Sequence, residues 1–202
     1  MGTEAMRLAI ALLHYPVLNR AGETVTTAVT NLDVHDLARS ALTYGVERFY
    51  VVTPVAEQRR LVNELLDHWC RGFGARYNPD RRRALELVEP VATLDEALGD
   101  YAGRTGRAVT PLLTGAGRRD GRPLRDLRRE LQRRPHMLLF GTGSGLAPEL
   151  FERGWPVVEP IEGTTDYNHL SVRAASAILL DRLVAGCRND SQDIQRNDKA
   201  SA

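Results

Sequence analysis

Short apolar runs alternate with amphipathic segments along most of the chain, and this alternation constrains the fold more than any other feature. The apolar runs have the length of strands buried on both faces. Strands that alternate with helices form parallel sheets covered by helices on both sides. The sequence therefore predicts an α/β fold with a mostly parallel sheet flanked by helices. The expected strands are 7–13, 48–53, 85–90, 108–114, 136–140 and 155–161, and the expected helices are 33–44, 54–73, 93–103, 123–133, 146–153 and 167–186.

Length and composition indicate one ordinary globular domain of 202 residues, 43% hydrophobic and 26% charged. We expect this domain over residues 1–187 and a disordered polar tail over 188–202. No stretch approaches the roughly 20 apolar residues of a membrane span. The apolar run near the N-terminus has acidic flanks and no small-residue cleavage site, so it predicts a strand rather than a signal peptide. Cys70 and Cys187 show neither metal-type spacing nor a disulfide framework, which favours a cytoplasmic protein without a metal.

The segment 33–44 has the pattern of a helix with one buried face, because apolar residues recur at helical spacing. Asn31 or Asp33 is a candidate for capping its N-terminus, and Gly45 is well placed to end it. His35 and Arg39 lie four residues apart and share a polar flank. Such a pair is either an ordinary surface pair or part of an active site.

The expected last helix, 167–186, is apolar almost all round, most clearly in AASAILL (174–180). A helix without a polar side is buried on more than one face. Either the rest of the domain surrounds it, or a second subunit covers it. A self-complementary contact between two copies is the simplest account, so we expect a homodimer.

Arginine supplies almost all of the positive charge: of the 27 basic residues only Lys199 is a lysine. The stretch 118–134 holds eight arginines and three acidic residues, although the whole chain has a net charge of only +1. Such a run is either a solvated helix face or a surface for an anionic partner, nucleic acid above all. The candidate contacts are Arg118, Arg119, Arg122, Arg125, Arg128 and Arg129.

Three successive expected strands end in loops that are rich in glycine or polar residues: LLTGAGR (112–118), FGTGSGL (140–146) and IEGTTDYNHLSVR (161–173). The carboxyl ends of parallel strands meet at one edge of a sheet, where ligands bind. Glycine lets main-chain groups approach a ligand closely. The spacing fits neither a dinucleotide-binding turn after the first strand nor a phosphate-binding P-loop. The sequence therefore predicts a cofactor pocket built from three late loops.

These residues resemble a known family. TNLDVHDLARSALTYGV (30–46), LLFGTGSGL (138–146) and YNHLSVRAASAILL (167–180) resemble, in order, the three motifs of the SPOUT superfamily of RNA methyltransferases, which use S-adenosylmethionine (SAM). Residues 7–186 as a whole are similar to a small bacterial group within it. The resemblance implies a deep trefoil knot in the C-terminal part of the chain, SAM held by main-chain groups of the knot loops, and a homodimer. It places at SAM the residues Thr114, Gly115, Gly141, Thr142, Gly143, Gly145, Leu146, Ile161, Gly163, Asn168 and Leu170.

The resemblance also implies catalytic roles. Arg39 matches an arginine that engages RNA and helps activate the 2′-hydroxyl in the ribose-methylating branch, while Asn31 and Ser171 match polar residues that position arginine and substrate. That branch often carries a glutamate in the second motif, where this chain has Thr142 or Ser144. The base-methylating branch uses an aspartate to accept a proton from a purine, and Asp166 is the candidate for that role.

The leading hypothesis is therefore SAM-dependent methyl transfer to tRNA or rRNA, at a ribose 2′-oxygen or a purine ring nitrogen. The alternative is a catalytically inactive SPOUT protein that binds SAM or RNA, which the altered second motif would explain. A nucleotide-binding oxidoreductase is a third possibility that depends on GTGSG alone.

Overall fold

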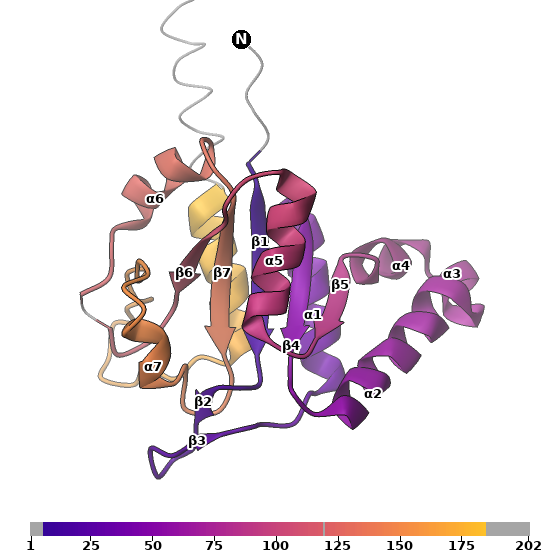
Figure 1. The fold of residues 1–202 in the computed structure, drawn as a ribbon, viewed down its shortest axis with the longest axis horizontal. Coiled ribbons are helices and arrows are strands. Elements are labelled where there is room, and N and C mark those ends of the chain that lie inside the picture. The colour runs from indigo at the N-terminus through magenta and orange to yellow at the C-terminus, as the bar shows by residue number, and fades with distance from the viewer. Residues whose placement is uncertain (1–5, 119, 185–202) are drawn as a thin grey trace, which may run out of the picture.

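Five parallel strands form the central sheet of the computed structural model, which describes residues 6–118 and 120–184. Their spatial order is β5-β4-β1-β7-β6, with β1 in the middle (Figure 1). The predicted α/β fold is confirmed, although β5 begins three residues later than expected. The strands are β1 (Leu8–Leu13), β4 (Arg48–Val52), β5 (Val88–Val91), β6 (Thr110–Leu113) and β7 (His136–Gly141).

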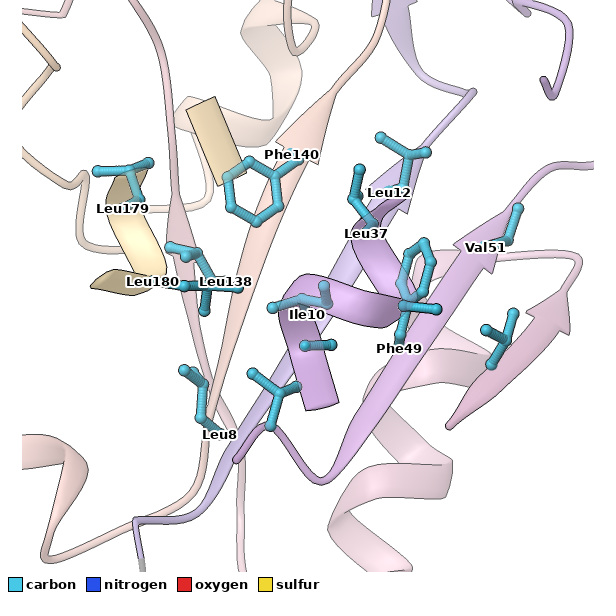
Figure 2. Close-up of a cluster of buried hydrophobic side chains, with 14 of the residues drawn as sticks. Leu8, Ile10, Leu12, Leu37, Phe49, Val51, Leu138, Phe140, Leu179 and Leu180 are labelled. Atoms are coloured by element: carbon cyan, nitrogen blue, oxygen red, sulfur yellow. The ribbon is translucent and has the colours of Figure 1, made fainter. Parts of the chain in front are cut away.

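The central strands are buried on both faces, and their side chains point alternately into two separate cores. Every residue of β1 is fully buried. Leu8, Ile10 and Leu12 face one core together with Leu138 and Phe140 of β7 (Figure 2). The residues between them in β1 face the other core. This arrangement explains why the strands read as continuous apolar runs rather than as alternating patterns.

Helices cover both faces of the sheet (Figure 1). One core contains side chains from α1 (Asn31–Thr43), α6 (Leu124–Leu131) and a helix over 172–184. The other contains side chains from α5 (Leu94–Thr105) and α7 (Pro148–Phe151). The last helix begins five residues later than expected, so 167–171 extend the preceding loop. The predicted tail over 188–202 lies outside the described residues.

The cap of α1 differs from the prediction. Thr30 is the N-cap, because its hydroxyl accepts a hydrogen bond from the main-chain N–H of Asp33 at 3.2 Å. Asn31 is the first residue inside the helix, so neither predicted cap is correct. The expected end is confirmed, since Gly45 follows the helix with φ +71°.

The segment 54–73, expected as one helix, is three elements. α2 (Ala56–Leu66) runs into the π-helical turn η1 (Asp67–Arg71), and Gly72 separates η1 from α3 (Phe73–Tyr77). A further helix, α4 (Pro79–Leu85), was not expected; Asn78 caps it and Pro79 opens it. Figure 1 shows α2, α3 and α4 extending beyond the β5 edge of the sheet.

The expected sixth strand, 155–161, forms only isolated bridges. The main-chain N–H of Val158 donates to the carbonyl of Leu113 at 2.8 Å, and that of Arg122 donates to the carbonyl of Val157 at 2.7 Å. The segment 156–159 therefore lies between the two ends of the 114–121 loop. A Cβ on Gly121 would come within 2.5 Å of the Glu159 main chain, so only glycine allows this approach. The trefoil knot itself stays a prediction.

A short hairpin, β2 (Val17–Leu18) with β3 (Thr24–Val25), was not expected; it lies near the carboxyl ends of the strands (Figure 1). Among the described residues, the helices are all too short or too polar to cross a membrane.

Candidate functional site

The three predicted loops lie at one edge of the sheet, because β6 and β7 are neighbouring parallel strands and 156–158 continues beside Leu113. The Thr114 hydroxyl donates to the carbonyl of Leu139 at 2.8 Å, which ties the first loop to β7. The Asn168 side-chain amide donates to the carbonyl of Ala116 at 3.4 Å, which ties the third loop to the first. The first and third loops are therefore in contact beside the end of β7, whereas the shared cofactor pocket of all three loops stays a prediction.

The glycine loop 141–146 packs tightly against the hairpin. The main-chain N–H of Ser144 donates to the carbonyl of Leu18 at 2.8 Å, and the N–H of Leu18 donates to the carbonyl of Gly145 at 2.9 Å. A Cβ on Gly143 would lie 2.6 Å from that Leu18 oxygen, and φ at Gly143 is +62°. Two needs, close approach and left-handed backbone, therefore require glycine there.

A hydrogen-bonded polar chain, half-buried at Thr27 and Thr142 and fully buried at His14, runs behind the glycine loop. The Thr142 hydroxyl donates to the carbonyl of Leu13 at 3.0 Å and is hydrogen-bonded to the Thr27 hydroxyl. The Thr27 hydroxyl is in turn 3.1 Å from Nδ1 of His14, a fully buried side chain whose Nε2 has no partner among the described residues. Burial lowers the pKa of His14 to about 4, so this imidazole is neutral near pH 7. Periodicity did not reveal this chain, since His14 and Thr27 lie in irregular segments.

The residues of this edge fit SAM. Glycines at 115, 141, 143, 145 and 163 keep side chains away from the loop main chain, and loop 141–146 carries no charged side chain. Gly145 has φ +109° and open space where a Cβ would lie. Several main-chain groups of the glycine loop already bond within the chain, so the open space at Gly145 is the feature of this loop that best suits a flat heterocycle. Ile161 packs against the first core, whereas Leu170 is 47% exposed.

The candidate catalytic residues lie in different surroundings. Arg39 is exposed on α1, on the flank that also carries His35, whose ring centre is 5.6 Å from that of Trp69. Asn31 lines a mostly apolar cavity of about 240 Å³ between α1 and α2. The Ser171 hydroxyl accepts from the main-chain N–H of Ala174 at 3.2 Å, so Ser171 caps the last helix. Asp166 is exposed in a bend of the third loop.

The first and third motifs meet through residues that sequence reasoning missed. The Arg173 guanidinium lies 3.5 Å from a carboxylate oxygen of Asp33 and 3.7 Å from one of Asp36. Arg173 begins the last helix and both acids lie on α1, so the pairs join the two motifs. Burial and the nearby Arg81 charge lower the pKa of His35, on the other flank of α1.

Comparison with known proteins decides the family. A family model described as SAM-dependent RNA methyltransferase matches residues 7–185. The chain belongs to this family. A protein of Aquifex aeolicus without an assigned function is 39% identical over 189 residues, which cover 90% of each chain.

Relatives named tRNA (guanine-N(1)-)-methyltransferase are longer than this chain. The one from Oleidesulfovibrio alaskensis is 45% identical over 177 residues, which cover 88% of this chain and 42% of the relative. The one from Nitratidesulfovibrio vulgaris is also 45% identical, over 180 residues and 42% of its length. The chain thus spans less than half the length of these curated relatives.

Solved structures share the fold of this chain. A TrmH/SpoU tRNA modifying enzyme of A. aeolicus has a TM-score of 0.54 at 15% identity, with 93% of this chain and 78% of that chain covered. The SpoU methyltransferase AviRb of Streptomyces viridochromogenes, solved with AdoMet, has a TM-score of 0.51 at 14% identity, with 90% and 58% covered. The SPOUT fold predicted from the three motifs is therefore confirmed.

The arginines of the run 118–134 are partly bonded within the chain. Arg118 pairs with Asp120 at 2.7 Å, Arg122 pairs with Glu130 at 2.5 Å, and the Arg128 guanidinium donates to the carbonyl of Arg182. Arg125 and Arg129 are exposed on α6, and Arg119 lies outside the described residues. Arg125, Arg128 and Arg182 also line a cavity of about 440 Å³. RNA binding by this run stays a prediction. Within residues 6–118 and 120–184, His, Cys, Asp and Glu side chains form no group suited to a metal.

Proposed function

We propose that this methyltransferase transfers the methyl group of SAM to an RNA at the edge where its three loops meet. The observation that supports the proposal is that Thr114 ties the first loop to Leu139 of β7, the strand that the glycine loop follows, and Asn168 ties the third loop to Ala116 of the first, in a chain of a SAM-dependent RNA methyltransferase family. Such an arrangement presents main-chain groups from three directions to one ligand.

In this proposal SAM is held by the main chain around Thr114 and Gly115, by 141–146, and by Ile161, Gly163, Asn168 and Leu170. When bound, SAM supplies a methyl group on a positively charged sulfur, which an RNA oxygen or nitrogen can attack. The protein orients the cofactor and excludes water. Thr142 holds the glycine loop through its hydrogen bond to Thr27, which is in turn bonded to His14.

We assign activation of the RNA nucleophile to Arg39, with Asn31 and Ser171 as positioning residues. A guanidinium stays protonated, so it favours the ionised form of a nearby hydroxyl rather than acting as a base. For a purine nitrogen, Asp166 is the proton acceptor in this proposal. Which of the two targets is used follows from which substitution abolishes transfer.

We propose tRNA as the first RNA to test, with rRNA as the second. The support is the name of the two relatives that are 45% identical, tRNA (guanine-N(1)-)-methyltransferase, over the part of them that this chain matches. We further propose that the protein acts in the cytoplasm as a homodimer. Arg39 has no side-chain hydrogen bond or ion pair among the described residues, and it lies on the α1 flank that faces Trp69 rather than Arg173. A second copy is one way to bring it to a SAM site.

The test combines binding and transfer. Calorimetry with S-adenosylhomocysteine, NAD and ATP should show binding of the first alone. Tritiated SAM with bulk tRNA and rRNA should then label one of these RNAs, and nucleoside mass spectrometry should identify the methylated atom. Binding of S-adenosylhomocysteine without transfer to either RNA would favour the inactive alternative. Binding of NAD instead would refute both.

A further inference from the structure

Two of the most exposed large apolar side chains in the described residues lie together on α3. Phe73 is 73% exposed and Tyr77 is 74% exposed. Their ring centres are 5.9 Å apart and their planes differ by 21°, so the rings are stacked side by side and both face water. Paired aromatic rings kept in water indicate a contact surface, because burying them would otherwise stabilise the fold.

The packing of α3 fixes the direction in which these rings point. Gly74 and Ala75, on the opposite side of the helix, are buried. A Cβ on Gly74 would lie 2.6 Å from the Trp69 ring and 3.0 Å from the His68 carbonyl, so the helix lies as close to η1 as a main chain can. Because the inner side has no room for a larger residue, α3 cannot rotate to bury Phe73 and Tyr77.

The surroundings of the two rings are basic. Arg76 is exposed and lies three residues after Phe73 and next to Tyr77, on the same side of the helix. The ion pairs among the described residues leave Arg76 without an acidic partner, whereas Arg71 is paired with Asp67. Nearby, the Arg81 guanidinium lies 4.5 Å from the centre of the Trp69 ring.

We propose that this α3 face, formed by Phe73, Arg76 and Tyr77, is a stacking platform for unpaired nucleotides of the RNA. Single-stranded RNA is recognised by aromatic rings on which bases stack, next to cations that contact the phosphates. Both elements are present, on a helix that packs closely against Trp69 and His68. The proposal rests on the proposed function only for its ligand, an RNA substrate.

A protein partner fits this face less well. Stable protein interfaces bury about 800 Å² on each side and have cores depleted in charge. The α3 face is one short helix with two rings and an arginine between them. It also lies beyond the β5 edge of the sheet, opposite the edge that carries α6 (Figure 1), so it is separate from the arginine run.

The first experiment measures binding of a fluorescein-labelled oligoadenylate of about ten nucleotides by fluorescence anisotropy. The double variant Phe73→Leu/Tyr77→Leu keeps apolar side chains but removes the rings, and it should bind at least about fivefold more weakly. The matched swap Phe73→Tyr/Tyr77→Phe keeps both rings and should bind like the wild type. A duplex of the same length should bind the leucine variant and the wild type alike, since its bases are already stacked.

The second experiment maps the contact. Ultraviolet cross-linking of the oligoadenylate to the wild-type protein, followed by trypsin, should modify the peptides Gly72–Arg76 and Tyr77–Arg81. Equal oligoadenylate binding by the leucine variant, or cross-links confined to other peptides, would overturn the platform. A change from dimer to monomer in the leucine variant would show instead that the face joins two copies, and would equally overturn it.

These results separate the platform from the proposed function. If the wild type methylates RNA and the leucine variant binds oligoadenylate normally, the platform alone is wrong. If the wild type binds no S-adenosylhomocysteine and transfers no methyl group, the proposed function fails whatever the platform does. The leucine variant should bind S-adenosylhomocysteine like the wild type, because the platform lies apart from the three loops.

Discussion

At the scale of single residues, Gly121 allows two segments of the chain, the 114–121 loop and 156–159, to lie in close contact. Its missing side chain lets 156–159 lie against it, with main-chain atoms of Val158 and Glu159 within 2.5 Å of an added Cβ. Main-chain atoms cannot move aside as a flexible side chain would. Gly121→Ala should therefore lower the free energy of unfolding by about 1–3 kcal/mol, measured by urea denaturation.

The matched control is Gly103→Ala. Gly103 lies in α5, and an added Cβ there meets nothing within 4 Å. This substitution should stabilise the protein by about 0.4–1 kcal/mol, because alanine reduces the freedom of the unfolded chain. Equal changes in the free energy of unfolding for the two substitutions would show that 156–159 does not pack closely against Gly121.

His14 predicts a loss of stability in mild acid. Its pKa is about 4 in the folded protein because of burial, against 6.5 as its ordinary value. Below pH 6.5 the unfolded chain binds a proton at this position and the folded chain does not, so stability falls as the pH drops from about 6.5 to about 4. The loss from His14 is on the order of 3 kcal/mol.

The measurement is urea denaturation at pH 7.5 and pH 4.5 for the wild type and His14→Asn. Asparagine keeps a polar atom near the position of Nδ1 but does not titrate, so the variant should lose less stability between the two pH values. His136, whose pKa burial also lowers, is unchanged in both proteins and serves as the internal reference. Parallel pH curves for the two proteins would show that His14 is not the group responsible.

Arg39→Gln separates chemistry from cofactor binding. If Arg39 acts on the RNA nucleophile, the variant should lose methyl transfer on the order of a hundredfold at saturating SAM, while its affinity for S-adenosylhomocysteine stays the same. Arg107→Gln, an exposed arginine bonded to the carbonyl of Arg133, is the control and should keep its rate. An equal loss of methyl transfer in both variants would show that Arg39 contributes to RNA binding through its charge and not to the chemical step.

At the scale of elements, the sequence predicted the buried strands well and the β5-edge helices poorly. β1 is apolar throughout and β7 is apolar from Met137 to Phe140, so their composition alone identifies these strands. The break between α2 and α3 depends on Gly72 and Gly74 packing against His68 and Trp69. That packing is specific to the folded chain, and glycine within an amphipathic pattern does not reveal it. The segment 155–161 looked like a strand, but its hydrogen bonds are divided between Leu113 and Arg122.

The arginines of the run 118–134 divide into two groups, which predicts different effects of substitution. Arg125 and Arg129 are exposed, so Arg125→Gln/Arg129→Gln should weaken RNA binding. The slope of the logarithm of the binding constant against the logarithm of the salt concentration should become shallower by roughly 0.7 to 0.9 for each phosphate that is no longer neutralised. Arg122 instead forms an ion pair with Glu130. Hydrogen bonds from Arg122 and Arg134 lower the pKa of the Glu130 carboxyl to about 2. Arg122→Gln should lower the thermal midpoint and leave the salt slope unchanged. Unaltered salt dependence in the double variant would identify α6 as a solvated face.

At the scale of the whole molecule, the sequence located the candidate site but not its internal support. The three loops were predictable because parallel strands end at one edge and glycines mark the loops. The polar chain of His14, Thr27 and Thr142 was not predictable, since it joins residues far apart in the sequence: Thr142 bonds to Leu13, 129 positions away. The pairs of Arg173 with Asp33 and Asp36 join two motifs that the sequence treats separately.

The association of two copies is a prediction about the last helix. Its residues Leu179, Leu180 and Leu183 are buried in the domain core. Ile178 and Ala174 lie on the opposite side of the same helix, where apolar side chains remain half-buried. A second copy that covers this side would form a self-complementary interface. Sedimentation analysis of the wild type at micromolar concentration should therefore give a dimer.

Ile178→Glu should convert that dimer to a folded monomer, because a carboxylate on this side would be buried without a partner in both copies. Leu61→Glu is the matched control: Leu61 is 51% exposed on α2, away from the last helix. If Leu61→Glu dissociates the protein and Ile178→Glu does not, the interface covers the α1–α2 cavity instead. The circular dichroism of both variants should match the wild type, which distinguishes dissociation from unfolding. Methyl transfer that falls with dissociation, while the chain remains folded, would show that the active site needs both copies.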